Sequence, residues 1–164
     1  MTRAQFILNS VREINNTYSN AHPSKGAIME LAGRVFDAVN PLVTIVTDNK
    51  TLTADDSGGI FGTGTDAKVF TLPATAAGLK YTFINTGAAG NNILAILPVA
   101  ADGISGTITL AASVVVDAGV ISKKLLNTKA TSKAGDAVEL IGTGVAGTTA
   151  WIIKTSTGIW AAEA

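Results

Sequence analysis

From Leu42 onward the chain consists of short runs rich in β-branched and aromatic residues, and this pattern most constrains its fold. The runs are LVTIVT, KVFTL, KYTFIN, NILAIL, GTITLA, SVVVDAGV, AVELIG, AWIIKT and GIWAA. Glycine, aspartate, asparagine, serine and proline separate them at intervals of roughly 8–15 residues, which is typical of an all-β sandwich or barrel. We therefore expect residues 42–164 to form a mainly β domain, a small antiparallel β-sandwich or barrel with strands over about 42–162.

Side chains alternate within these runs as strands with one buried face require. In KYTFIN, Tyr81 and Phe83 fall on one face, whereas Thr82 and Ile84 fall on the other. GTITLA alternates in the same way between threonine and aliphatic residues. The stretch 42–52 connects the two halves of the chain and could itself form a strand.

The first forty residues follow a helical period instead. Apolar residues recur at intervals of three and four along Ala4, Ile7, Val11, Ile14, Tyr18 and Ala21, and a second stripe runs from Ile28 to Val39. Pro23 ends the first helix, and Asn40–Pro41 stops the second, because the residue before a proline is driven out of the α region. We expect residues 1–41 to form a helical arm that packs on its own domain or, through heptad-like positions, anchors or oligomerises the chain. The candidate contacts with an oligomer partner or a capsid are Ile7, Val11, Ile14, Tyr18, Ile28, Leu31, Val35 and Phe36.

Charge is scarce and balanced. Charged residues make up 15% of the chain and hydrophobic residues 47%, and the 12 basic and 12 acidic side chains cancel. A surface poor in charge, with a net charge of zero, favours association. The balance leaves no basic patch for nucleic acid or for an anionic membrane, and no apolar run approaches the roughly 18 residues of a membrane span. The N-terminus lacks the apolar core of a signal peptide, so we expect a protein made, and kept or assembled, inside a cell.

Chemically reactive side chains are few. The chain has no cysteine and one histidine, His22, so we expect no cofactor, no metal site and no catalytic triad. Asp55 and Asp56 could bind calcium, which needs about six to eight oxygens, but an aspartate that caps the TADDSGG turn explains them better. A hairpin turn also explains the G-x-G-x-x-G in IGTGVAGTTAW better than dinucleotide binding, because TTAWIIK has the composition of a strand.

Three aromatic residues are candidates for ligand stacking. Trp151 and Trp160 lie near the C-terminus and, if exposed, could stack on sugar rings or bases, as could Tyr81. AWIIKT and GIWAA flank a Ser-Thr-Gly turn, however, and we favour the interpretation that the two tryptophans belong to a core-facing hairpin.

Five motifs occur in one order along residues 50–160: LTADDSG, VFTLPA, AGLKYTFIN, GDAVEL and AWIIKTSTGIW. Together they resemble a pattern of tailed-phage virion proteins, in which a Thr-x-x-Asp-Ser-Gly turn precedes a strand ending in Leu-Pro-Ala and a Trp…Gly-x-Trp hairpin closes the domain. The matching positions are Asp56, Ser57, Gly58, Leu72, Pro73, Gly78, Tyr81 and Phe83. The doubled aspartate and the inserted GGIFGTGTDAK depart from the pattern, and the first forty residues are not part of it.

This resemblance implies a small β-barrel or sandwich of the kind found in capsid decoration proteins, head fibres and tail-associated proteins, commonly as trimers. It carries no catalytic residue. The leading hypothesis is thus a non-enzymatic capsid decoration (cement) or head-fibre protein, a homotrimer that contacts the major capsid protein or another virion protein. Its location would be the virion, after assembly in the host cytoplasm. The alternatives are a tail-associated or fibre-tip module that binds a receptor or glycan, and a carbohydrate hydrolase that uses Asp55, Asp56 or Asp102.

Overall fold

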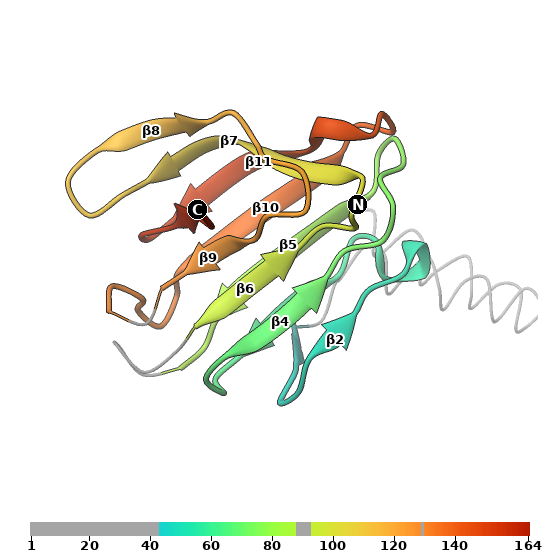
Figure 1. The fold of residues 1–164 in the computed structure, drawn as a ribbon. Coiled ribbons are helices and arrows are strands. Elements are labelled where there is room, and N and C mark those ends of the chain that lie inside the picture. Colours follow the sequence, from blue (N-terminus) through green and yellow to red (C-terminus); the bar gives the residue numbers. More distant parts are fainter. Residues whose placement is uncertain (1–42, 88–92, 129) are drawn as a thin grey trace, which may run out of the picture. The chain divides into compact units, whose positions relative to one another are not determined.

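The computed structural model describes residues 43–87, 93–128 and 130–164, whose regular structure consists of twelve β-strands and one short 3-10 helix, η1 (Ala54–Asp56) (Figure 1). The prediction of a mainly β domain is confirmed for these residues. The predicted helical arm, with all of its candidate contact residues from Ile7 to Phe36, lies outside the described residues, as does His22.

The strands form two sheets around one hydrophobic core to which both sheets contribute. Sheet A has seven strands in the order β1 (Val43–Ile45), β3 (Ile60–Thr63), β5 (Lys80–Asn85), β10 (Ala137–Gly142), β11 (Gly147–Thr157), β7 (Asp102–Thr109) and β8 (Val114–Asp117). Sheet B has five strands in the order β12 (Ala161–Ala162), β9 (Leu125–Asn127), β6 (Leu94–Leu97), β4 (Lys68–Thr71) and β2 (Lys50–Thr51).

Both sheets are mixed, so the prediction of an antiparallel architecture is wrong. The chain alternates between the sheets at first, because β1, β3 and β5 belong to sheet A while β2, β4 and β6 belong to sheet B. A strand that reverses into the facing sheet and reverses again returns to its first sheet in its original direction. Strands β1, β3 and β5 therefore pair in parallel, as do β2, β4 and β6. The pairs β5–β10, β10–β11, β7–β8, β6–β9 and β9–β12 are antiparallel.

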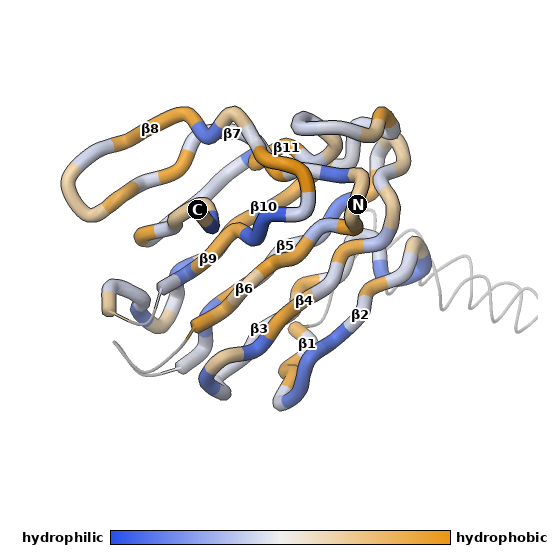
Figure 2. Tube along the Cα trace, viewed as in Figure 1, coloured by the Kyte–Doolittle hydropathy of each residue, from blue (hydrophilic) through white to orange (hydrophobic). Residues whose placement is uncertain are grey.

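Alternation along the strands builds the core. In β5 the side chains of Tyr81 and Phe83 are fully buried, as the sequence predicts. Thr82 and Ile84, which alternate with them, point to the other face and are only partly buried. The ring of Phe83 lies 5.2 Å from that of Phe70 in sheet B and 6.2 Å from that of Phe61 in sheet A, measured between centroids. These three phenylalanine rings join the two sheets across the core. Hydrophobic residues run through the strands of both sheets in Figure 2.

Both tryptophans lie in the core, but they do not form a hairpin. Trp151 belongs to β11 in sheet A, and Trp160 directly precedes β12, which pairs with β9 in sheet B. Both side chains are fully buried. The predicted core-facing position is therefore confirmed, whereas the predicted pairing of the two flanking runs is wrong: the chain crosses from one sheet to the other through the Ser-Thr-Gly turn.

The glycine-rich stretch IGTGVAG forms a hairpin connection, as its flanking strands predict. Strands β10 and β11 pair in an antiparallel way, with Gly142 opposite Trp151 at the turn end. Gly144 within the turn has a φ of +79°, a left-handed conformation that residues with a Cβ adopt only with strain. The glycines thus serve the turn geometry.

Candidate interaction surface

Aliphatic side chains are exposed on both edge strands of sheet A. In β8, Val114 and Val116 are 65% and 78% exposed, and in β1, Val43 and Ile45 are 47% and 58% exposed. The described residues include three further exposed large hydrophobic side chains, which lie in loops: Val120, Ile121 and Val145. We call β1 and β8, with their outward aliphatic side chains, the two open edges of sheet A.

The register of β8 places its two exposed valines on the outer face of the sheet. Val114 lies opposite Thr109 and Val116 opposite Thr107, whereas Val115 between them packs against the core. Because side chains alternate along a strand, Val114 and Val116 must share the face that Val115 does not use. This edge therefore presents two valines to solvent.

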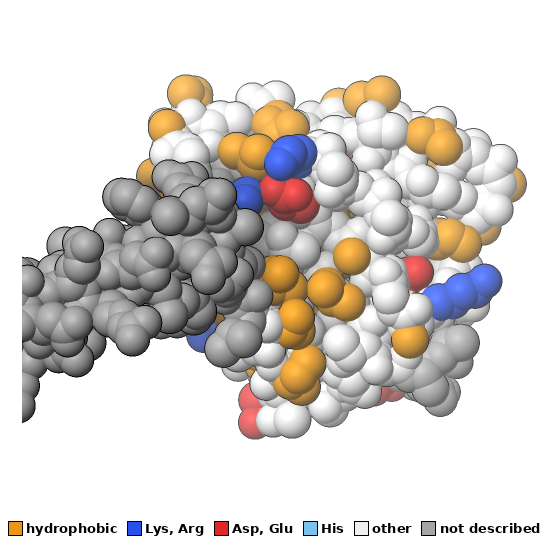
Figure 3. Space-filling view, turned by 180° about the vertical axis from the view of Figure 1, so that it is seen from behind, with side chains coloured by type: hydrophobic (Ala, Val, Ile, Leu, Met, Phe, Trp, Pro, Cys, Tyr) orange, Lys and Arg blue, Asp and Glu red, His pale blue; other side chains and the backbone are white. Residues whose placement is uncertain are grey.

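At the other edge, β1 places its aliphatic side chains over a glycine of the neighbouring strand. Ile45 lies opposite Gly62, and a Cβ built on Gly62 would lie 3.0 Å from Ile45 Cδ1 and 3.4 Å from Val43 Cγ1. The same cross-strand row continues from Gly62 to Ile84 and Ala137. An apolar row thus extends inward from the β1 edge across the outer face of sheet A, and hydrophobic side chains are visible on this side of the molecule in Figure 3.

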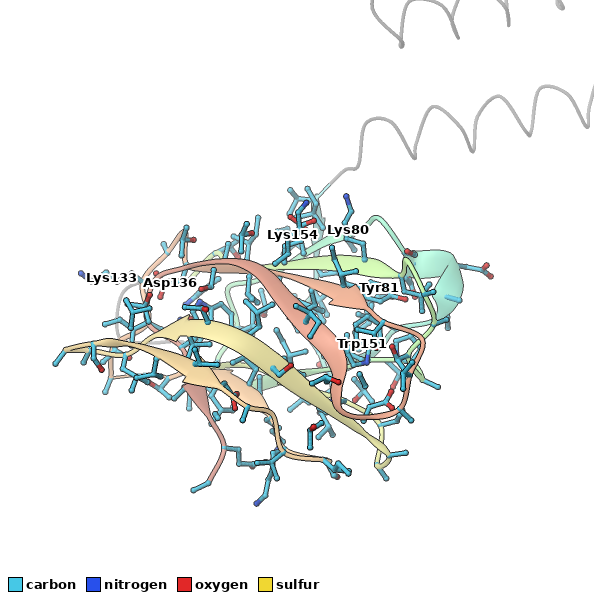
Figure 4. The ribbon with its side chains drawn as sticks, turned by 90° about the horizontal axis from the view of Figure 1, so that it is seen from above. Lys80, Tyr81, Lys133, Asp136, Trp151 and Lys154 are labelled. Carbon is cyan, nitrogen blue, oxygen red and sulfur yellow. The ribbon has the colours of Figure 1, made fainter. Side chains whose placement is uncertain are left out.

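One charged cluster interrupts the outer face of sheet A. The Glu139 carboxylate lies 3.2 Å from Lys154 Nζ and 3.8 Å from Lys80 Nζ. The two lysines project on the same side from β11 and β5 in Figure 4. Both lysine side chains are about half exposed, so these ion pairs contribute at most about 1 kcal/mol each to stability. Neither β1 nor the outward part of β8 takes part in this cluster.

The edges of sheet B carry charges instead. Lys50 opens β2, pairs with Asp56 at 3.5 Å and lies 5.5 Å from the ring centroid of Phe61. Glu163, directly after β12, pairs with Lys124 at 3.3 Å, and hydrogen bonds from the Lys124 backbone and side chain hold the pKa of Glu163 below its usual value. Charged residues on edge strands oppose pairing with another chain. The two sheets therefore differ in how their edges are protected.

The three candidates for ligand stacking lie in the core, so the exposure on which a stacking role depends is not met in this structure. Tyr81, Trp151 and Trp160 are each 0% exposed, and no ring face can meet a sugar from solvent. The structure does bring Tyr81 and Trp151 together, with ring centroids 5.6 Å apart. The Trp160 indole donates a hydrogen bond to the Thr157 carbonyl at 2.8 Å, whereas the buried Trp151 indole N–H has no partner among the described residues.

The buried hydroxyl of Tyr81 holds together two parts of the fold. It donates a hydrogen bond to the Thr53 carbonyl at 2.8 Å. Burial, together with the negative charge of Asp56, raises the pKa of Tyr81 to about 12. The neutral phenol therefore ties β5 to the turn that contains η1.

Of the three carboxylates considered as catalytic candidates, Asp56 and Asp102 accept hydrogen bonds from the backbone, and Asp55 is exposed in η1. Asp56 Oδ2 accepts hydrogen bonds from Thr53 N at 2.8 Å and Thr53 Oγ1 at 3.1 Å, which confirms that an aspartate caps this turn. Burial alone would raise the pKa of Asp56, but the hydrogen bonds from Thr53 and the charge of Lys50 lower it overall. Asp102 is buried and accepts a hydrogen bond from Thr75 N at 2.8 Å. Within the described ranges, no three His, Cys, Asp or Glu residues gather as a metal site would require.

A buried polar network joins the two sheets, and sequence reasoning missed it. Asn85 at the end of β5 donates a hydrogen bond through Nδ2 to Asn127 Oδ1 of β9 at 2.8 Å. Asn127 Nδ2 donates to Asp136 Oδ2 at 2.7 Å and to the Ile159 carbonyl at 3.1 Å. Asp136 Oδ2 also accepts from Lys133 N at 2.9 Å. The available sequence signal for this network was the asparagine at the end of each of the apolar runs KYTFIN and LLN. An asparagine in that position is equally typical of a turn.

Comparison with models of protein families, with curated proteins and with solved structures found no match. No helix among the described residues is long and apolar enough to cross a membrane.

Proposed function

We propose that this chain is a non-enzymatic structural protein of a tailed-phage virion, a homotrimeric capsid decoration or head-fibre protein. The observation that carries the proposal is the distribution of apolar side chains in the β domain. Its aromatic rings are buried, while aliphatic side chains are exposed along both open edges of sheet A. An exposed aliphatic surface on a compact β domain is suited to contacts between proteins.

The composition of the chain supports the same proposal. Only 15% of its residues are charged and its net charge is zero, so electrostatic repulsion between copies is weak. A specific interface buries roughly 800 Å² per partner, and a symmetric oligomer repeats that burial at every subunit contact. Several weak contacts with a capsid would then act together through avidity. The partner in this proposal is the major capsid protein or another virion protein, and the location is the particle surface.

The alternative function, a tail-associated or fibre-tip module that binds a glycan, has less support. Its proposed stacking residues, Tyr81, Trp151 and Trp160, are buried. A glycan site in the described residues would have to rely on polar side chains without an exposed aromatic ring.

Two measurements on the full chain test the proposal. Light scattering after gel filtration should give a mass three times that of the 16.6 kDa chain. Antibodies against the protein should label the heads of purified phage particles in electron micrographs, and added protein should co-sediment with particles stripped of it until the sites are saturated. A monomeric mass together with absence from purified particles would overturn the proposal. Labelling confined to the tail would favour the fibre-tip alternative.

A further inference from the structure

We infer that the two open edges of sheet A pair with each other between copies of this chain, β8 of one copy beside β1 of the next. This inference rests on the proposed homotrimer, because three such contacts close a ring, and it names the surface that holds that trimer together. The interface would continue sheet A from one copy into its neighbour.

The backbone at both edges is available for pairing. Strands β1 and β8 stand at the two ends of sheet A and, within the described residues, pair only with β3 and β7 respectively. An edge strand presents N–H and C=O groups that can hydrogen-bond to a strand of another chain. Each edge of sheet A thus offers half of a strand pair.

The two edges cannot pair within one copy. Five strands separate β1 from β8 in sheet A, and neighbouring strands lie about 4.8 Å apart, so the edges are roughly 29 Å apart along the sheet. Neither edge can therefore be the partner of the other within one copy, whereas a second copy supplies a strand of matching kind.

The side chains of the two edges match. Strand β1 has the sequence VTI and β8 the sequence VVVD. Asp117 is the one charge in either strand, and β1 has no acidic residue that would repel it. Val43 and Ile45 are exposed at one edge and Val114 and Val116 at the other. Pairing would place aliphatic side chains of the two copies beside one another on one face of the new strand pair, and such cross-strand contacts between apolar side chains stabilise a sheet.

Sheet B supplies a contrast within the same molecule. Its edge strands β2 and β12 are only two residues long, and the charged residues Lys50 and Glu163 lie in or directly after them. Short strands and charged side chains are the usual means by which proteins prevent edge pairing. In sheet A the one charged residue of the two edge strands is Asp117 at the end of β8, and its carboxylate accepts a hydrogen bond from Gly119 N. The remaining edge residues of sheet A are uncharged, and this difference directs the pairing to sheet A.

Pairing of β8 with β1 accounts for the exposed aliphatic side chains at both edges of sheet A, whereas pairing of β8 with itself accounts for those of β8 alone. A contact between two different edges is heterologous and can close into a ring of three copies. A contact of β8 with β8 is two-fold symmetric, stops at a dimer and leaves the apolar β1 edge in solvent. The heterologous pairing is therefore the one that agrees with a homotrimer.

Charge substitutions at the edges test the inference in the full chain. We expect Val114→Lys/Val116→Lys and Val43→Lys/Ile45→Lys each to convert the trimer to monomer, with at least a 100-fold rise in the concentration needed for assembly. Val145→Lys is the matched control, because Val145 is 67% exposed in the β10–β11 turn, away from both edges, and this variant should remain trimeric. Circular dichroism of the monomers should keep the wild-type β spectrum, as expected for changes at exposed positions.

Cysteine cross-linking identifies which strands meet. The chain contains no cysteine, so introduced thiols are the only ones present. Four double variants combine Val43→Cys or Ile45→Cys with Val114→Cys or Val116→Cys, since directly opposed Cβ atoms in a strand pair lie about 4.5–5.5 Å apart, close to disulfide range. After mild oxidation, at least one double variant should run as a covalent trimer on a non-reducing gel. Each single variant should run as a monomer.

The outcomes separate this inference from the proposed function. A wild-type monomer would overturn the homotrimer and the inference together. A wild-type trimer that survives both lysine variants and yields no cross-link in any double variant would overturn the inference alone. Covalent dimers from Val114→Cys or Val116→Cys by itself would show that β8 pairs with β8, and would also overturn it. Loss of the trimer only in the β1 variant would show that β1 has a different partner.

Discussion

Replacing Asn127 by leucine should destabilise the β domain strongly, because Asn127 is the centre of the polar network between the sheets. Its side chain is fully buried and takes part in three hydrogen bonds, with Asn85, Asp136 and the Ile159 carbonyl. Leucine has a similar volume but no polar atoms, so all three partners lose a hydrogen bond without gaining access to water. The substitution therefore tests whether the network holds the sheets together.

The expected loss follows from the number of partners and their burial. A buried polar group that loses its partner costs about 1–3 kcal/mol, and more if it is charged. Asp136 keeps the hydrogen bond from Lys133 N, which reduces its share of the loss. We expect Asn127→Leu to lower the free energy of unfolding by about 3–5 kcal/mol.

Urea unfolding, followed by the fluorescence of the two buried tryptophans, measures this loss at a fixed protein concentration. The control is Asn49→Leu, because Asn49 Oδ1 accepts a single exposed hydrogen bond from Val69 N at 3.0 Å that water can replace. We expect the control to lose about 0.5–1 kcal/mol. The reasoning is refuted if the free energy of unfolding falls no more in Asn127→Leu than in the control, while its slope against urea concentration is the same in both variants.

A double-mutant cycle locates the effect within the network. Asn85→Leu should also destabilise the domain, and the double variant with Asn127→Leu should lose less than the sum of the single losses, by about 0.5–3 kcal/mol. Additive losses would show that the two asparagines act independently and that the 2.8 Å contact between them contributes little.

Three further predictions follow from individual environments. The folded-state pKa of Tyr81 is about 12, above its usual value, so its contribution to stability is complete below about pH 10 and is lost as the pH rises through 12. Absorbance titration, compared with that of Tyr81→Phe, should show tyrosinate formation at Tyr81 centred near pH 12, and a midpoint near pH 10 in the folded protein would contradict this. Gly158 and Gly78 share a φ of +83°, but a Cβ would overlap the Asp136 carboxylate only at Gly158. Gly78→Ala should therefore cost about 1–2 kcal/mol and Gly158→Ala distinctly more in urea unfolding; equal losses would contradict this. Acrylamide should quench the tryptophan fluorescence weakly until urea unfolds the domain, and strong quenching of the folded protein would contradict the burial of both indoles.

Local patterns were sufficient for strands whose residues alternate cleanly. The burial of Tyr81 and Phe83 was predictable because a period of two depends only on neighbours along the chain. Strand β3 was not predicted, since IFGT lies in a glycine-rich stretch that suggests a loop. Strand β9, with the sequence LLN, is too short to show a period. Both acquire their strand conformation from pairing with neighbours that are distant in sequence.

The candidate interaction surface was predictable only in part. Low charge and zero net charge indicated association. Nothing in the runs LVTIVT and SVVVDAGV distinguishes an edge strand with exposed valines from a central strand with buried ones. The position of β1 and β8 at the ends of sheet A depends on the order of all seven strands. The sequence alone therefore could not assign these residues to a surface.

By itself, the sequence determined that this protein has a mainly β domain, where most of its turns fall and which face of KYTFIN is buried, because these properties depend on residues close together in the chain. The tertiary structure decided that the sheets are mixed, that Trp151 and Trp160 reach the core from different sheets, and that Asn85, Asn127 and Asp136 meet. The physical reason is that strand order and direction depend on which sheet each turn leads into. That choice is made by packing across the core, which sums contacts between residues far apart in the sequence.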